Sequence, residues 1–185
     1  GHFFNQPLPD PLPPLLEILQ LGDDFNRPLP DPLPPLLEIL KLGDSFDRPL
    51  FDLSPNLREL HLGNNFNQPL PVKLLPVLES LHIGYQFDQP LDTLPPLLKE
   101  LYWDGNDPPL PDNIHLHPAL EKIHFGDDFN RPLPELPPHL RELSFGKNFN
   151  QPLPEGVTSI KFGTKDGQSM FDTPLTGLPT GLRHL

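Results

Sequence analysis

Three histidines and one tyrosine occupy equivalent places in a repeating sequence, each two residues before a position that is mostly glycine. Acidic or basic side chains stand a further two residues back from several of them. This candidate set comprises His61, His82, Tyr102 and His124, together with Glu59, Glu100 and Lys122. Imidazole, phenol and carboxylate groups can ligate metal, transfer protons or recognise a partner, so each of these three chemistries needs weighing.

A metal site would use His61 and His82 with Glu59. Equivalent positions on adjacent strands lie about 5 Å apart, which allows two imidazoles to approach one ion. Zinc needs ligands that converge to about 2.1 Å from a single point. An exposed row of histidines is more often free of metal, so we expect neither a metal nor another cofactor.

Acid–base catalysis would use His61 or His124 with a neighbouring glutamate. The sequence contains no nucleophile elbow, phosphate-binding loop or metalloenzyme motif to accompany them. A row of side chains on an open sheet also lacks the closed pocket that catalysis needs. We therefore predict that the protein is not an enzyme, and that this set forms a partner-binding patch rich in aromatic and titratable groups.

The positions of these residues follow from a repeat of 20–22 residues. A Phe-Asn/Asp-Gln/Arg-Pro-Leu string begins at Phe4, Phe25, Phe46, Phe66, Phe87, Phe129 and Phe149, with a variant at Phe171. A glycine precedes most of these strings, and a Leu-x-x-Leu-x-Leu pattern precedes each glycine. We treat residues 1–185 as one repeat domain, degraded near 104–110 and carrying an insertion near 164–170.

The two halves of each repeat predict different structures. The leucine pattern alternates at its end, as in a short strand with one buried face. The other half contains most of the 30 prolines, which remove N–H donors and exclude a helix interior. The predicted fold is a leucine-rich-repeat-type solenoid: a curved parallel β-sheet of about nine short strands, with polyproline-II and turn return segments and little or no α-helix.

The recurring residues are expected to hold the coils together. The phenylalanines should stack inside as a spine, and the glycines should allow the turn out of each strand. We expect two polar columns to hydrogen-bond the backbone of neighbouring coils. One follows each phenylalanine (Asn26, Asp47, Asn67, Asp88, Asn130, Asn150 and Asp172), and the other precedes it (Asp24, Ser45, Asn65, Gln86, Asp128 and Asn148). Calcium binding is the rival interpretation, but these columns are mixed amides and carboxylates rather than converging carboxylates.

Composition restricts the partners. The net charge of −12 disfavours nucleic acid, because an acidic surface repels phosphates. No apolar run approaches the roughly 18–20 residues that cross a bilayer, and no signal peptide opens the sequence, so we expect no membrane partner. The absence of cysteine is consistent with a reducing compartment, and we expect a cytoplasmic location.

With Phe-Asn-Gln-Pro-Leu recurring after Leu-x-x-Leu-x-Leu-Gly, the sequence resembles the FNIP repeat family, which is similar to leucine-rich repeats and is known mainly from social amoebae and giant viruses. The resemblance covers nearly the whole chain. It implies a solenoid that binds other proteins, in the host cytoplasm if the protein is viral. In giant viruses such repeats often follow an F-box, which implies host ubiquitination machinery or its substrates as partners, but no F-box-like segment is visible here.

Two hypotheses of function follow. The first is a protein-interaction module that uses the exposed strand face, which Ile18 and Ile39 would extend. The second is a structural or assembly protein that self-associates through its end coils, near Phe4 and Leu185.

Overall fold

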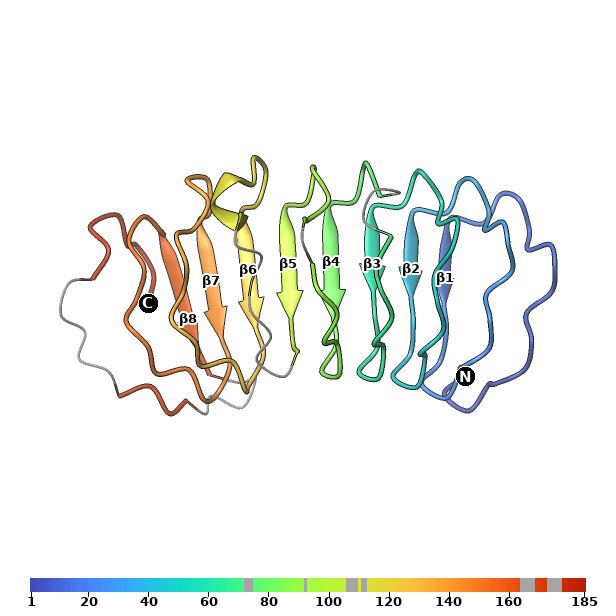
Figure 1. Ribbon diagram of the computed structural model, residues 1–185, viewed down its shortest axis with the longest axis horizontal. Coiled ribbons are helices and arrows are strands. Elements are labelled where there is room, and N and C mark those ends of the chain that lie inside the picture. The colour runs from blue at the N-terminus through green and yellow to red at the C-terminus, as the bar shows by residue number, and fades with distance from the viewer. Residues whose placement is uncertain (72–74, 92, 106–109, 111–112, 164–168, 173–177) are drawn as a thin grey trace.

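The computed structural model describes residues 1–185 except 72–74, 92, 106–109, 111–112, 164–168 and 173–177. Eight short strands follow one another along a single parallel sheet in chain order (Figure 1). They are β1 (Ile18–Gln20), β2 (Ile39–Lys41), β3 (Glu59–His61), β4 (Ser80–Ile83), β5 (Glu100–Trp103), β6 (Lys122–Phe125), β7 (Glu142–Phe145) and β8 (Ser159–Phe162). The predicted solenoid is therefore confirmed.

The ninth predicted strand is reduced to a single parallel bridge between Ser159 and His184. The described return segments contain no α-helix, and one 3₁₀ turn spans Ile114–Leu116. Prolines account for this, since they leave the return path extended or turned. The degraded coil and the insertion lie partly outside the described residues, at 106–109 and 164–168.

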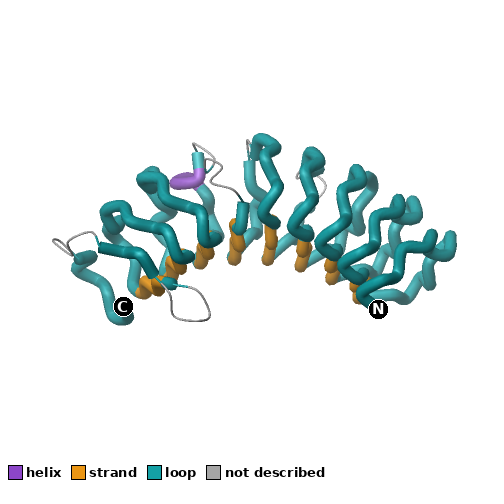
Figure 2. Tube along the Cα trace, turned by 90° about the horizontal axis from the view of Figure 1, so that it is seen from below, coloured by secondary structure: helices purple, strands orange, loops and turns teal. Residues whose placement is uncertain are grey.

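The sheet lines the inner side of an arc, and the proline-rich return segments form its outer side (Figure 2). Strand register follows the repeat, so that Glu59 pairs with Ser80 and His61 with His82. Each strand buries its second residue and turns its first and third residues towards the concave face, as at β3. The candidate set therefore comes to lie on the concave face.

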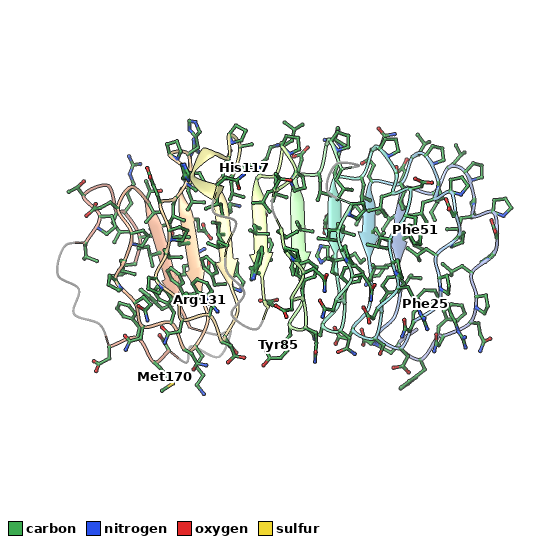
Figure 3. All side chains as sticks on the ribbon, viewed as in Figure 1. Phe25, Phe51, Tyr85, His117, Arg131 and Met170 are labelled. Carbon is green, nitrogen blue, oxygen red and sulfur yellow. The ribbon has the colours of Figure 1, made fainter. Side chains whose placement is uncertain are left out.

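The interior is a stack of apolar side chains that only neighbouring coils can bury. Phe25, Phe46 and Phe66 are fully buried. Their rings stack with centroids 6.2 Å apart and nearly parallel planes. The phenylalanine after Phe87 is missing from the degraded coil, and the spine resumes at Phe129, which stacks on Phe149. The predicted spine is confirmed on both sides of that break, and Figure 3 shows Phe25 within the molecule.

Glycine is required before each spine phenylalanine because the backbone there lies close to the backbone of the previous coil, and not because of the turn. A Cβ on Gly43 would lie 2.2 Å from the carbonyl oxygen of Gly22, and one on Gly63 would lie 2.0 Å from that of Gly43. Positive φ appears in this column only at Gly163. The expectation that these glycines serve the turn was wrong, because the constraint is the spacing between adjacent coils.

The polar column after each phenylalanine acts as predicted. The Asn5 Oδ1 accepts the Asn26 backbone N–H at 3.0 Å, and the Asn67 Oδ1 accepts that of Asp88 at 3.0 Å. The same bond recurs at Asp47, Asn67, Asn150 and Asp172. These side chains supply the acceptors that a turn without a β-ladder would otherwise lack.

The expectation for the second polar column was wrong. The backbone N–H groups of Ser45 and Asn65, not their side chains, bond the previous coil, donating to the carbonyls of Asp23 and Asp44. The side-chain bonds come from the preceding position, where the Asp44 and Asp127 carboxylates accept the N–H groups of the next coil. The side chains of Asp24, Asn65, Gln86 and Asp128 are exposed.

Candidate functional site

The four predicted aromatic residues form a ladder across the middle of the concave face. The His61 and His82 rings stack with centroids 3.6 Å apart and planes 13° from parallel. The His82 and Tyr102 rings stack at 3.9 Å and 7°. The His124 ring continues the row at 5.7 Å from Tyr102, tilted by 43°. Because β3 to β6 are in register, one column of the sequence becomes one continuous row of rings, which we call the ring ladder.

A column of ion pairs runs beside the ring ladder. The Glu59 carboxylate pairs with the Lys41 ammonium at 2.7 Å and with the His61 Nε2 at 2.5 Å. The Glu100 carboxylate pairs with the Lys122 ammonium at 2.6 Å and accepts the Tyr102 hydroxyl at 3.3 Å. Further along, Lys161 and Glu142 pair at 2.7 Å. Each glutamate of the face thus has a lysine from an adjacent strand, and the face is balanced in charge.

These contacts set the protonation of the face. Burial lowers the pKa of His61, against the effect of its hydrogen bond to Glu59. Burial, with a smaller effect of nearby His61, lowers the pKa of His82 to about 4. The Lys41 hydrogen bond lowers the pKa of Glu59, and burial raises that of the Tyr102 phenol. At neutral pH the His61 and His82 imidazoles are therefore uncharged beside the ionised Glu59 carboxylate.

The ladder geometry does not suit metal binding. Stacked rings place their edges side by side rather than aiming nitrogens at a common point, as zinc requires. Among the described residues, no group of three or more His, Asp or Glu side chains could hold a metal ion. Because the His61 Nε2 is already bonded to Glu59, this ring has one nitrogen fewer to offer.

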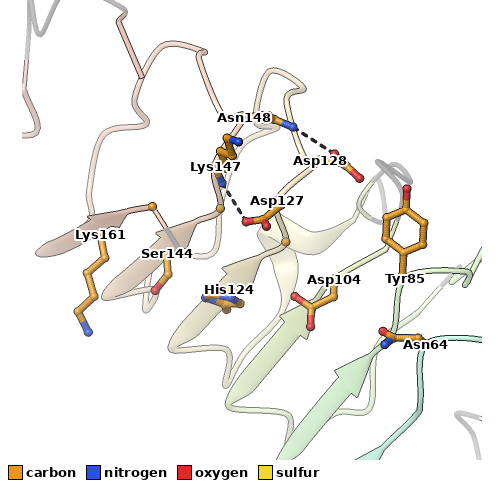
Figure 4. Close-up of a pocket in the computed structure, with 13 residues that line it drawn as sticks. Asn64, Tyr85, Asp104, His124, Asp127, Asp128, Ser144, Lys147, Asn148 and Lys161 are labelled. Atoms are coloured by element: carbon orange, nitrogen blue, oxygen red, sulfur yellow. Dashed lines mark hydrogen bonds between the residues drawn. The ribbon is translucent and has the colours of Figure 1, made fainter. Parts of the chain in front are cut away.

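A hollow of about 800 Å³ opens beside the end of the ring ladder, and residues at or after the carboxyl ends of β3 to β8 line it (Figure 4). Tyr85, Asp104, His124 and Asp128 are among its lining residues. Asp104 occupies the glycine column here, and the coils separate: a Cβ on Gly126 would lie 3.1 Å from the Asp104 carbonyl oxygen, against 2.0–2.5 Å for the carbonyl contacts elsewhere in the column. Burial raises the pKa of the Asp104 carboxyl, while nearby His124 lowers it.

Tyr85 bridges the degraded coil. A hydrogen bond to the Asp128 carboxylate raises the pKa of its phenol. Tyr85 follows β4 and Asp128 follows β6, so the two side chains come from the coils on either side of the one that contains β5. Sequence reasoning missed Tyr85 as a residue of the hollow; the available signal was an aromatic residue at a turn position that holds Asp or Asn in four other coils (Asp23, Asp44, Asn64 and Asp127).

The structure brings all seven predicted residues onto one surface, with Glu59, Glu100 and Lys122 directly beside the rings. The prediction omitted Lys41, Glu142 and Lys161, whose ion pairs become visible only when adjacent strands are aligned. Ile18 is 55% exposed and Ile39 is half-buried, so these two residues lie on the same face towards β1.

The comparisons with known proteins agree with this geometry. The FNIP repeat family matches residues 4–31 and 129–165. Among solved structures, the chain is similar to CroV588, described as a novel circular LRR protein, with 28% identity and a TM-score of 0.62 over 98% of this chain. The chain therefore contains FNIP repeats and has the fold of an FNIP/LRR-like repeat protein. A comparison with curated proteins finds no match.

The FNIP chain spans 35% of the length of CroV588, which comes from a giant virus. The repeat type and the solenoid fold indicate a protein-interaction module, and folds of this type are typically non-enzymatic. No helix among the described residues of the FNIP chain is long and apolar enough to cross a membrane.

Proposed function

We propose that this FNIP protein binds another protein through its concave face, with the ring ladder at the centre of the contact. The observation that carries the proposal is the ladder itself: four rings from four successive strands, aligned on a surface that no described segment of the chain covers. The binding residues would be His61, His82, Tyr102 and His124, with Glu59, Glu100 and Lys122 beside them.

The physical reason lies in the cost of ordering side chains. Rings that already pack against one another lose little conformational freedom when a partner arrives, so more of the contact energy remains for affinity. Aromatic side chains are enriched among the residues that dominate protein interfaces. The ion pairs on the face are also formed in advance, and a partner need not separate them to reach the ring edges.

The setting we propose is capture of a host protein in the cytoplasm, as part of a larger viral or amoebal protein. The resemblance to F-box-associated FNIP repeats supports host ubiquitination machinery or its substrates as the partner class. The net charge of −12 argues against nucleic acid as the ligand.

A second candidate, self-association through the end coils, is favoured by one observation. Six residues of the Asn/Asp column accept the backbone N–H of the next coil, and the same pattern would use the Asn5 N–H of the first coil and the Asp172 carboxylate of the last. Phe4 is 42% exposed and Leu185 is 61% exposed at these ends. Both surfaces are of the kind that a further coil covers, whether it comes from a second copy or from the same chain.

A pull-down from host-like cell extract, analysed by mass spectrometry, tests the first proposal. The bait is compared with a triple variant, His61→Ser, His82→Ser and Tyr102→Ser, and with a control, His2→Ser, His139→Ser and Phe51→Ser, at exposed positions off the face. We expect the control to enrich the same protein as the wild type and the face variant to lose it. If the face variant, with unchanged circular dichroism, enriches the same proteins as the wild type, the concave face is not the binding site.

Light scattering over a range of concentrations tests the second candidate. Self-association predicts a mass that rises with concentration and that Phe4→Asp or Leu185→Asp reduces. A monomer at every concentration would contradict it.

A further inference from the structure

The ring ladder contains two imidazoles in direct contact. The His61 and His82 centroids are 3.6 Å apart, and the His82 ring is covered on its other face by Tyr102 at 3.9 Å. Two positive charges at that separation repel strongly in a half-buried site. The stack as it stands is therefore a structure of neutral rings, and it cannot hold a proton on each imidazole without changing.

The charged groups around the two imidazoles are unevenly placed. His61 faces Lys41 on β2, Glu59 on its own strand and His82 on β4. The groups around His82 are His61 and Glu59 on β3, Lys41 on β2, and Tyr102 and Glu100 on β5. Glu59 bonds His61 directly, whereas no carboxylate among the described residues bonds the His82 ring. The first proton therefore binds His61, and the second must bind His82 next to a ring that is already charged.

We propose that the contact between His61, His82 and Tyr102 is an acid-sensitive switch of the concave face, which presents its partner-binding surface while both imidazoles are neutral and opens when protons enter the stack. The inference rests on the proposed function, since it concerns the regulation of that same surface. A partner bound at neutral pH is then released as the surroundings become acidic.

The direction of the switch follows from burial. Desolvation lowers the pKa of both rings, that of His82 to about 4, so the closed form persists through mildly acidic conditions. Protonation of the pair therefore falls below the ordinary range of histidine, and that of His82 falls near pH 4. The hydrogen bond to Glu100 raises the pKa of Lys122, and the hydrogen bond from Lys41 lowers that of Glu59, so these two groups stay charged as the imidazoles begin to protonate.

Nuclear magnetic resonance tests the switch on the chain alone. Imidazole signals of ¹³C-labelled protein are followed from pH 7.5 to pH 4, together with the Tyr102 ring signals. We expect His61 and His82 to titrate below their ordinary range, and the Tyr102 signals to move with them as the stack opens. In His61→Gln, which removes a neighbouring charge, the His82 midpoint should move to higher pH, and in the control His139→Gln it should not. Titration of both rings near pH 6.5 would overturn the switch. So would Tyr102 signals that do not change while the imidazoles titrate.

Partner release separates this inference from the proposed function. Protein captured at pH 7.5 is washed at decreasing pH, and the release midpoint is compared between the wild type and His61→Gln. We expect release to follow the imidazole titration and to shift upward in the variant. Equal midpoints would overturn the switch while leaving the proposed function intact, whereas a wild-type face that holds no partner at pH 7.5 would overturn both, whatever the spectra show.

Discussion

A Cβ on Gly43 would lie 2.2 Å from the carbonyl oxygen of Gly22 and 2.4 Å from its carbonyl carbon. The atoms it would meet belong to the backbone of the previous coil, which cannot move aside without disturbing the strands on either side. Contact between these two glycines therefore sets the distance between coils at this edge of the sheet.

Gly43→Ala should destabilise the protein by about 3 kcal/mol or more, because overpacking against backbone forces the coils apart. Urea unfolding followed by circular dichroism measures the change. Gly181→Ala is the matched control, since a Cβ there meets no atom within 4 Å. Equal stabilities for the two variants would show that close approach is not what the column requires.

Asn67→Ala should cost about 0.5–1.5 kcal/mol, because it removes the side-chain acceptor of the Asp88 backbone N–H in the next coil. The Asn67 Oδ1 accepts both the Asp88 backbone N–H and the Gln89 side-chain amide, each at 3.0 Å. Asn67→Asp should retain most of the stability, since Asp47 fills the same role one coil earlier. Asn65→Ala, at an exposed position of the other polar column, serves as the control and should change the unfolding free energy little.

Phe66→Ala should destabilise the protein by about 3–5 kcal/mol, the usual cost of emptying a core aromatic site. Phe66 is fully buried and stacks between Phe46 and Phe87 at 6.2 Å and 6.3 Å. Phe51→Ala removes the same side chain at a position 70% exposed and should have a small effect. Calorimetric unfolding of the two variants measures the difference. Comparable losses of stability would contradict the view that the stacked phenylalanines stabilise the fold.

Stability should fall as pH decreases from about 6.5 towards 4. The pKa of His82 is lowered from 6.5 to about 4 on folding, so the unfolded chain binds more protons in this range and acid favours it. Partial exposure of the ring reduces the effect to about 1–2 kcal/mol. At lower pH, protonation of the Glu59 carboxylate removes its ion pairs and adds to the loss of stability, because folding lowers the pKa of this group.

Urea midpoints at pH 7.5, 6 and 5 for the wild type and for His82→Gln measure this dependence. The variant cannot take up the proton and should lose less stability than the wild type between pH 6.5 and pH 5. A pH profile that is unchanged by the substitution would assign the acid sensitivity to other groups.

The period of the sequence determined most of the fold. Leucines at strand spacing, with prolines in the other half of every repeat, exclude a helical return and leave stacked coils as the way to bury the core. The same periodicity aligned His61 with His82 and Tyr102 with His124, because equivalent positions of a solenoid become neighbours. For that reason the seven residues of the candidate face could be named in advance.

Only the tertiary structure decided how those side chains meet. A repeat states that two positions are adjacent, but side-chain torsions and local burial decide whether two imidazoles stack, converge on an ion or bond a carboxylate. In the Lys41–Glu59–His61 network, Glu59 pairs with Lys41 of the neighbouring strand and with His61 of its own strand. No single repeated position of the sequence therefore shows this network. The role of the glycines depended in the same way on the spacing between coils, a distance between chain segments about 20 residues apart that no local pattern records.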